Sequence, residues 1–443
     1  MAFRDFATPQ MSRRSLIRSG AMLGAGAAFA GLPLGRAAMA ADAMKWPSVA
    51  KLIDGYVTPR KLANVVATLG WGQGAPDVVA AGNLALGAEA PAGVDSLYRI
   101  YSMTKPVTGI ATMMLIEDGK LGLDQPLAEI LPKFADMKVQ KTYDGGIAPA
   151  DLEPAARPIT IRHLLTHTAG LGYTIMQKGP IKTAYEDAGA IAGQVTKLPI
   201  GAVFGRGTPV RSLEAFADAL ARLPLVAQPG TRWLYSVSID LLGRVIEVAS
   251  GQTFDAFLKD RIFAPTGMDS TYFTVPQSEL GRFTTNYGIM NGAMLPLDPA
   301  NQSVYADAPA FPMGGAGLVS SARDYDRFLR MLLGYGTIDG RRVMSEPAVR
   351  LATSNLLPDG VETKGTFAEG QGFGAGGRVG LGAMAGTFGW GGAAGTVAYV
   401  DFRRSLRAVM MTQYMPSDTY PLTAEFSKAV VADLAAMAGA SPA

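Results

Sequence analysis

The sequence predicts a mixed α/β (α+β) fold in which a largely antiparallel sheet, built from both chain ends and flanked by helices, carries an inserted all-helical lobe. Strand-like hairpins near both ends and helical periodicity in the middle predict this arrangement. With 443 residues, 48% of them hydrophobic, the chain is long enough for a two-lobed core. We expect residues 41–100 and about 335–443 to form the sheet lobe, residues about 101–334 to form the helical lobe, and the functional site to lie between them.

The first 40 residues have the pattern of an export signal. Paired arginines, Arg13 and Arg14, precede a weakly apolar run at 20–34, and the Ala-Met-Ala segment 38–40 matches a small-x-small cleavage site. The arginine pair resembles the Tat signal, whose cargo crosses the membrane already folded. The run is too short to cross a bilayer, which needs about 20 residues. We expect an exported bacterial protein, periplasmic or secreted, that is not inserted in the membrane after cleavage. A buried N-terminal helix is the alternative.

The net charge does not indicate a nucleic-acid partner. The chain carries 40 Lys and Arg against 37 Asp and Glu, a net charge of +3, but residues 1–40 alone hold five Arg and one Asp. The remainder of the chain therefore has a net charge of −1. It shows no stripe of Lys and Arg with interleaved aromatic residues, so we expect no binding to nucleic acid.

Both ends of the chain after the signal supply strands. A short helix is predicted at 49–56, and apolar segments at 65–69 and 78–81 flank a Gly- and Pro-containing turn, which predicts a hairpin. Segments 396–400 and 406–411 predict a second hairpin, and the chain then closes on a helix near 424–437.

Helices dominate the middle of the chain. Apolar residues recur there with helical spacing, and connectors rich in Pro and Gly separate the periodic stretches. The expected helices are 107–118, 161–166, 213–223, 239–250, 253–262 and 322–333.

The composition limits the chemistry that the chain can perform. The sequence has no Cys, which excludes disulfides, thiolate nucleophiles, Fe–S clusters and Cys-type zinc sites. It has only two His. We expect catalysis, if present, to use Ser, Lys, Tyr or carboxylate side chains.

Ser102 and Lys105 form a candidate nucleophile and base. They are three residues apart at the start of an apolar helix, so both side chains lie on one helix face. A partly desolvated lysine can remove the proton of a hydroxyl, and the helix N-terminus offers N–H groups to a developing oxyanion. The same spacing at Ser48 and Lys51, with no preceding strand, shows that the pattern alone is weak; a capping serine beside a solvated lysine is the alternative.

Two later segments could complete such a site. Tyr235 precedes a predicted helix, and its phenol can share a proton relay with a lysine. The Phe-Gly-Trp-Gly-Gly-Ala segment 388–393 comes just before the predicted strand 396–400, and its glycines allow a substrate to approach the backbone closely. Taken singly, a buried tyrosine and a turn are the simpler interpretations.

The order of these motifs resembles the serine β-lactamase and penicillin-binding protein superfamily. Tyr98-Arg99-Ile100-Tyr101-Ser102-Met103-Thr104-Lys105, Trp233-Leu234-Tyr235 and Trp390-Gly391-Gly392 look most like family VIII carboxylesterases, which are similar to class C β-lactamases. The resemblance extends from about Trp46 to Ala438.

The resemblance implies a serine hydrolase that forms an acyl-enzyme without metal or organic cofactor. It makes Ser102 the nucleophile, Lys105 and Tyr235 the general-base pair, and the N–H groups of Ser102 and Ala393 the oxyanion hole. The implied substrate wall is Trp390, Gly391 and Gly392.

Two departures from the superfamily pattern favour esters over β-lactams. Val237 stands where many relatives have the Asn of Tyr-x-Asn, and Trp390 stands where β-lactamases have the Lys of Lys-Thr-Gly. The chain is therefore expected to hydrolyse small-molecule carboxylic esters. A β-lactamase, a D-amino-acid peptidase or amidase, a transacylase and a catalytically silent binding protein are the alternatives, and the oligomeric state is left open.

The two histidines, His163 and His167, have the spacing of a zinc-protease helix. However, Leu164 stands where the general-base Glu of that motif belongs, so we expect structural roles and no metal. A Ser-His-Asp hydrolase is also disfavoured, because the sequence has no G-x-S-x-G and no histidine after His167.

Overall fold

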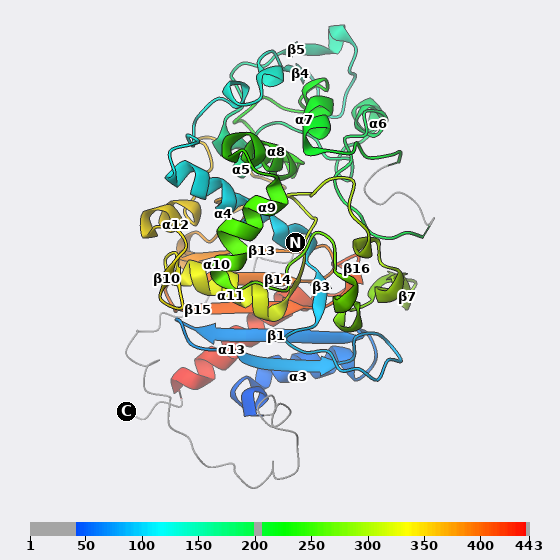
Figure 1. The fold of residues 1–443 in the computed structure, drawn as a ribbon, viewed down its shortest axis with the longest axis vertical. Coiled ribbons are helices and arrows are strands. Elements are labelled where there is room, and N and C mark those ends of the chain that lie inside the picture. Colours follow the sequence, from blue (N-terminus) through cyan, green and yellow to red (C-terminus); the bar gives the residue numbers. More distant parts are fainter. Residues whose placement is uncertain (1–40, 199–205, 440–443) are drawn as a thin grey trace.

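The predicted sheet from both chain ends is present. The computed structural model describes residues 41–198 and 206–439, so the expected signal at 1–40 lies outside the described residues. A seven-stranded antiparallel sheet has the order β11-β12-β13-β14-β15-β1-β2 (Figure 1). The strands are β1 (Asn64–Trp71), β2 (Asp77–Gly82), β11 (Gly372–Phe373), β12 (Arg378–Val379), β13 (Thr387–Gly391), β14 (Val397–Asp401) and β15 (Leu406–Met411).

The register of β1 on β15 joins the two ends of the chain and explains their continuous apolar sequence. Val66 pairs with Met411, and Leu69 with Ala408. Successive side chains of a strand point to opposite faces of the sheet. Accordingly, Val65 and Leu69 pack in one buried cluster while Val66 packs in another. Both faces are covered, so most positions along these strands hold apolar residues.

Helices from both termini cover one face of the sheet. The helix α3 (Pro47–Val57) packs against α13 (Leu422–Gly439) and β2, and Figure 1 shows both helices beside β1. Trp46 and Ile53 from the first helix and Phe426 from the last belong to the same buried cluster as Val65. Both helices were expected within about two residues of these bounds.

The helix α11 (Ala322–Leu333) packs on the sheet, although the expected boundary near 335 assigned it to the helical lobe. It contacts β15, β1 and β14. A buried ion pair joins it to the sheet, with Arg407 Nε 2.6 Å from Asp326 Oδ1. Removing either partner would leave an uncompensated buried charge, which fixes the helix against β15. The apolar periodicity of a helix predicts the helix but not which lobe it packs against.

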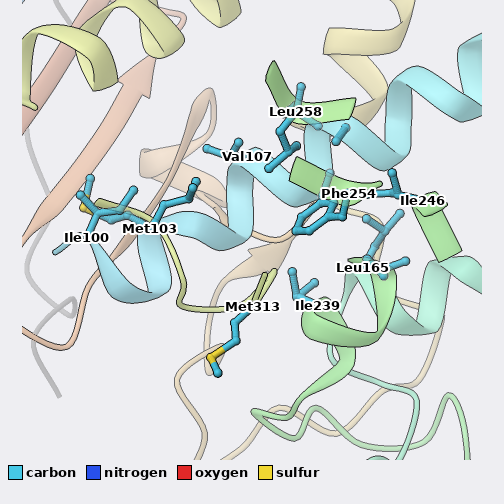
Figure 2. Packing of buried hydrophobic residues seen from close by; sticks show 14 of the residues in the cluster. Ile100, Met103, Val107, Leu165, Ile239, Ile246, Phe254, Leu258 and Met313 are labelled. Carbon is cyan, nitrogen blue, oxygen red and sulfur yellow. The ribbon is translucent and has the colours of Figure 1, made fainter. Parts of the chain in front are cut away.

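The helical lobe is built around α4 (Thr104–Glu117). The side chains of this helix are buried from Thr104 to Leu115, and Figure 2 shows Val107 among residues of other helices, including Leu165, Ile239 and Phe254. The other helices of the chain between residues 161 and 352 are α5 (Ile161–Leu165), α6 (Gly179–Asp187), α7 (Leu213–Ala221), α8 (Ser238–Ser250), α9 (Phe254–Leu258), the π-helical turn η5 (Lys259–Phe263), α10 (Ala264–Thr266) and α12 (Glu346–Ala352).

Short elements complete the fold. They are the strand pairs β3 (Leu97–Arg99) with β8 (Val319–Ser321), β4 (Lys138–Gln140) with β5 (Leu152–Pro154) and β9 (Thr337–Ile338) with β10 (Arg341–Arg342), and the sheet of β6 (Asn286–Met290), β7 (Ala293–Asp298) and β16 (Tyr414–Met415). The 3₁₀ turns are η1 (Tyr101–Met103), η2 (Leu127–Glu129), η3 (Pro132–Phe134), η4 (Pro149–Asp151), η6 (Gln277–Arg282), η7 (Ala300–Gln302), η8 (Val304–Ala306) and η9 (Gly382–Met384). Among the described residues, no helix combines the length and apolarity needed to cross a membrane.

Candidate active site

Ser102 lies at a sharp change of direction between β3 and α4. It occupies the 3₁₀ turn η1, and the preceding Tyr101 has a φ of +41°, which residues other than glycine seldom adopt. Gly392, just beyond the end of β13, lies so close to this turn that a Cβ on it would collide with the carbonyl of Ile100. Ser102 is therefore held between the helical lobe and the sheet, and its side chain is only partly buried.

The structure brings Ser102, Lys105 and Tyr235 together. Ser102 Oγ lies 2.6 Å from Tyr235 Oη, and Lys105 Nζ donates to Ser102 Oγ at 3.2 Å. Lys105 Nζ also lies 4.5 Å from the centroid of the Tyr235 ring. Lys105 is fully buried, whereas Ser102 and Tyr235 are partly exposed. The hydroxyl of this partly exposed serine thus contacts both expected proton-transfer groups.

Gly315 and Asp240 form the inner wall behind Lys105. The carbonyl of Gly315 accepts a hydrogen bond from Lys105 Nζ at 2.7 Å, and the N–H of Gly315 donates to Asp240 Oδ1 at 2.8 Å. Asp240 Oδ2 has no hydrogen-bond partner among the described residues. Burial raises the pKa of Asp240 to about 6, against the opposing effect of the Lys105 charge. A side chain at position 315 would collide with this carboxyl group, so glycine permits the contact.

We expect Asp240→Asn to flatten part of the pH dependence of stability. An unfolded aspartate ionises near pH 4, whereas Asp240 in the fold ionises near 6, so the folded state holds the extra proton between these values. Stability then falls as pH rises from about 4 to about 6. The amide keeps an acceptor for Gly315 and cannot ionise. Relative to wild type, the variant should gain on the order of 2 kcal/mol between pH 4 and pH 7.

Urea unfolding of wild type and Asp240→Asn at pH 4, 5, 6, 7 and 8 checks this expectation. The difference between the two free energies of unfolding is compared across the series, since effects of other groups cancel in it. Two curves that stay parallel from pH 4 to pH 7 would show that the Asp240 proton is not coupled to folding.

Aromatic side chains surround Tyr235 and form what we call the aromatic wall. Measured between ring centroids, Tyr235 lies 5.7 Å from Phe367 and 6.1 Å from Trp390. Trp390 is nearly buried in β13 and stacks under the guanidinium of Arg378, whose pKa is lowered to about 10 by burial. The remaining members of the wall are Trp233, Tyr173, His167 and Phe373.

The predicted glycine segment belongs to a strand. Residues 388–391 lie in β13, which pairs with β14, whereas the sequence placed the segment only just before the predicted strand 396–400. The N–H of Gly392 donates to the carbonyl of Thr396 at 2.8 Å, so it is already occupied. Ala393 lies two residues beyond the end of β13 and is partly exposed, and β13 itself contacts the turn that carries Ser102.

The second Ser-x-x-Lys pair lies elsewhere. Ser48 is in α3 on the opposite face of the sheet, where its N–H donates to the carboxylate of Asp433, and Lys51 is exposed.

The two histidines of the zinc-like pattern make different contacts. His163 caps α5, because its Nδ1 accepts the N–H of Thr160 at 3.1 Å. His167 is fully buried beside Tyr235, with 5.0 Å between the ring centroids. Within residues 41–198 and 206–439, no group of three or more His, Asp or Glu side chains is arranged to hold a metal ion.

Sequence reasoning missed three residues of this site. Asp240, His167 and Arg378 contact it, and none of them was named from the sequence as a residue of the site. A signal existed only for Asp240, a carboxylate in an otherwise apolar helix pattern directly after Tyr235.

Comparison with known proteins places the chain in a family. The Beta-lactamase family model matches residues 49–432. Protein Rv1367c of Mycobacterium tuberculosis is 37% identical over 338 residues, covering 73% of this chain and 78% of its own length. Esterase EstB of Burkholderia gladioli is 30% identical over 344 residues, with the same coverage of 73% and 78%.

A solved structure shows the same fold. EstCE1, described as a hydrolase with promiscuous acyltransferase activity, superimposes with a TM-score of 0.70 at 25% sequence identity and covers 88% of this chain and 99% of its own. The sequence resemblance to the serine β-lactamase and penicillin-binding protein superfamily is thereby confirmed. The chain belongs to the beta-lactamase family, within a superfamily of serine hydrolases and acyltransferases that includes esterases.

Proposed function

We propose that this protein is a carboxylesterase that cleaves small-molecule esters through a covalent acyl-Ser102. The observation that carries the proposal is the convergence on Ser102 Oγ of Tyr235 Oη at 2.6 Å and Lys105 Nζ at 3.2 Å. Both distances allow direct proton transfer from the hydroxyl. The site therefore has a nucleophile and a general base in hydrogen-bond contact, as nucleophilic catalysis requires.

The proposed reaction has two halves. In the first, Ser102 Oγ attacks the ester carbonyl as its proton passes to the Tyr235 and Lys105 pair, and the N–H groups of Ser102 and Ala393 stabilise the oxyanion. Collapse of the intermediate breaks the bond to the alcohol, which leaves with the proton. In the second half, water attacks the acyl group, its proton follows the same route, and release of the acid restores Ser102.

The aromatic wall supports esters as the substrate class. Trp390 occupies the position where a β-lactamase lysine would attract a substrate carboxylate, and Phe367 and Tyr235 extend the apolar surface beside Ser102. Apolar surface removed from water on binding favours uncharged acyl or alcohol groups. The relative EstB is an esterase and EstCE1 a hydrolase, which agrees with this choice.

A substrate panel tests the proposal. Wild type and Ser102→Ala are compared on short-chain aryl esters, the matching anilides and a chromogenic cephalosporin. We expect the ester to be hydrolysed far better than the amide or the β-lactam, with every activity lost in the variant. A higher kcat/KM for the cephalosporin than for the ester would overturn the ester assignment.

Acyl transfer is the second candidate function. An acyl-enzyme beside an apolar wall can release its acyl group to an alcohol in place of water, and EstCE1 is described as having promiscuous acyltransferase activity. Adding a primary alcohol to the ester assay and measuring the new ester against the free acid distinguishes the two fates. A product mixture that stays free of the new ester would exclude the transfer.

We further propose that the protein is exported from a bacterial cell. The support is the arginine pair and the cleavage-like segment within residues 1–40. A mature N-terminus at Ala41, found by mass spectrometry of the periplasmic or secreted fraction, would agree, whereas the intact chain confined to the cytoplasm would contradict export.

A further inference from the structure

His167 binds the backbone on both sides of Tyr235. Its carbonyl accepts the N–H of Leu234 at 2.9 Å, and its Nδ1 accepts the N–H of Ser236 at 3.3 Å. These are the two residues that flank the phenol in sequence. The imidazole also contacts the Tyr235 ring, with 5.0 Å between the centroids. One residue thus holds the peptide before Tyr235, the peptide after it, and the face of its ring.

The hydrogen bonds of the imidazole determine which of its nitrogens carries the proton of the neutral ring. Because Nδ1 accepts the N–H of Ser236, the proton of the neutral ring is on Nε2. Nε2 has no hydrogen-bond partner among the described residues, whereas Ser236 Oγ lies 3.1 Å from Nδ1. The polar contacts of this side chain are therefore directed at the segment that carries Tyr235.

The environment keeps this acceptor available. His167 is fully buried, and both its burial and the positive charge of Lys105 lower its pKa well below the usual value. The neighbouring titratable groups are Lys105 and Tyr235. A protonated Nδ1 could not accept the N–H of Ser236, so the neutral ring is the form that the contact requires.

The backbone of His167 makes both contacts compatible. Its φ of +57° is in the left-handed region, where His and Asn occur more often than most residues. The residue directly follows the short helix α5 and its C-cap Thr166. This turn directs the carbonyl and the side chain of one residue toward the same extended segment, 233–237.

We propose that His167 is a positioning residue that fixes the phenol of Tyr235 at Ser102 Oγ. The inference rests on the proposed function, because it assigns His167 a task only if the phenol takes part in the reaction. His167 does not touch Ser102 in the described contacts; it acts through the backbone and ring of Tyr235. A displacement of about 1 Å in such a group costs up to about 10²-fold in rate.

The chain contains its own matched control. His163 also uses Nδ1 to accept a backbone N–H, but from Thr160 at a helix start, and it makes no ring contact with Tyr235. Replacement of either histidine by Leu removes one acceptor from one buried backbone N–H. Replacement by Asn restores an acceptor oxygen near the position of Nδ1, and Asn tolerates the left-handed backbone at residue 167.

We expect His167→Leu to lower kcat for an aryl ester on the order of 10- to 100-fold with little change in KM, and His167→Asn to recover most of it. His163→Leu should lower the Tm while kcat stays near that of wild type. Equal kcat values for His167→Leu and wild type, or for His167→Leu and His167→Asn, would overturn the positioning role.

Two further variants keep the test decisive. If His167→Leu does not fold, His167→Gln replaces it, since its oxygen lies one bond farther out; Asn exceeding Gln in kcat supports the proposal, and equal values overturn it. Ser102→Ala distinguishes a failure of the proposed function from a failure of the positioning role of His167. Activity retained in Ser102→Ala removes the proposed function, whereas an inactive Ser102→Ala beside a fully active His167→Leu removes only the task of His167.

Discussion

Ser102→Ala is expected to abolish ester hydrolysis, with a fall in kcat on the order of 10⁴-fold or more. The substitution removes the atom that Tyr235 Oη and Lys105 Nζ both contact, so neither proton-transfer group has a hydroxyl to act on. Ser102 is partly exposed, and the substitution removes only one oxygen atom, so we expect the fold to be unaffected. Spectroscopic assay of the hydrolysis of a short-chain aryl ester measures the loss of activity, and thermal unfolding measures the stability of the variant.

The second Ser-x-x-Lys pair supplies the control for this experiment. Ser48→Ala removes the same oxygen from the same local pattern in α3, where the N–H of Ser48 is bound to Asp433. We expect full activity from Ser48→Ala and stoichiometric labelling of it by a fluorophosphonate, with no labelling of Ser102→Ala. Hydrolysis that survives in Ser102→Ala would exclude the acyl-serine route.

The parts of the fold that were predictable are those with a local signal. The hairpin of β1 and β2 and the helices α4 and α8 were expected from periodicity, because each buries a repeating set of apolar residues. Their packing partners were not predictable in this way. The placement of α11 on the sheet depends on a buried ion pair of Asp326 with Arg407, a contact between residues 81 positions apart.

The same distinction applies to the site. Ser102 and Lys105 were identifiable because three residues on a helix start determine their relative position. The chemistry of a phenol made Tyr235 a candidate, but its pairing with Ser102 followed from the family resemblance, since the two residues meet across 133 positions. His167 has no local feature that links it to Tyr235, because its contact with Ser236 spans 69 residues and its partner there is a backbone N–H, which carries no sequence signal.

The buried amine of Lys105 contacts both Ser102 and the inner wall of the site. Its Nζ donates to Ser102 Oγ and to the carbonyl of Gly315, and no carboxylate forms a salt bridge with it among the described residues. Burying a polar amine is costly without hydrogen-bond partners, and these two oxygens supply them. The charge of Lys105 opposes the effect of burial on the pKa of Asp240, so the amine and the inner wall interact electrostatically.

Lys105→Met and Tyr235→Phe are each expected to lower kcat by on the order of 10² or more, as for other losses of proton transfer. Methionine fills most of the buried space of the lysine without an amine. Phenylalanine keeps the ring contacts with Trp390 and His167 and loses only the oxygen that meets Ser102. Steady-state kinetics on the same aryl ester, with KM and kcat separated, measures the loss; near-normal kcat in either variant would remove that residue from the relay.

The double variant tests whether the two groups form one relay. If Lys105 and Tyr235 act on the same proton, removing the second group from an enzyme that has already lost the first costs little more. We therefore expect the combined variant to retain a kcat within about tenfold of the weaker single variant. Two independent groups would instead multiply their losses. A double variant slower than the weaker single one by a further factor on the order of 10² would show that the amine and the phenol contribute separately, although both contact Ser102 Oγ.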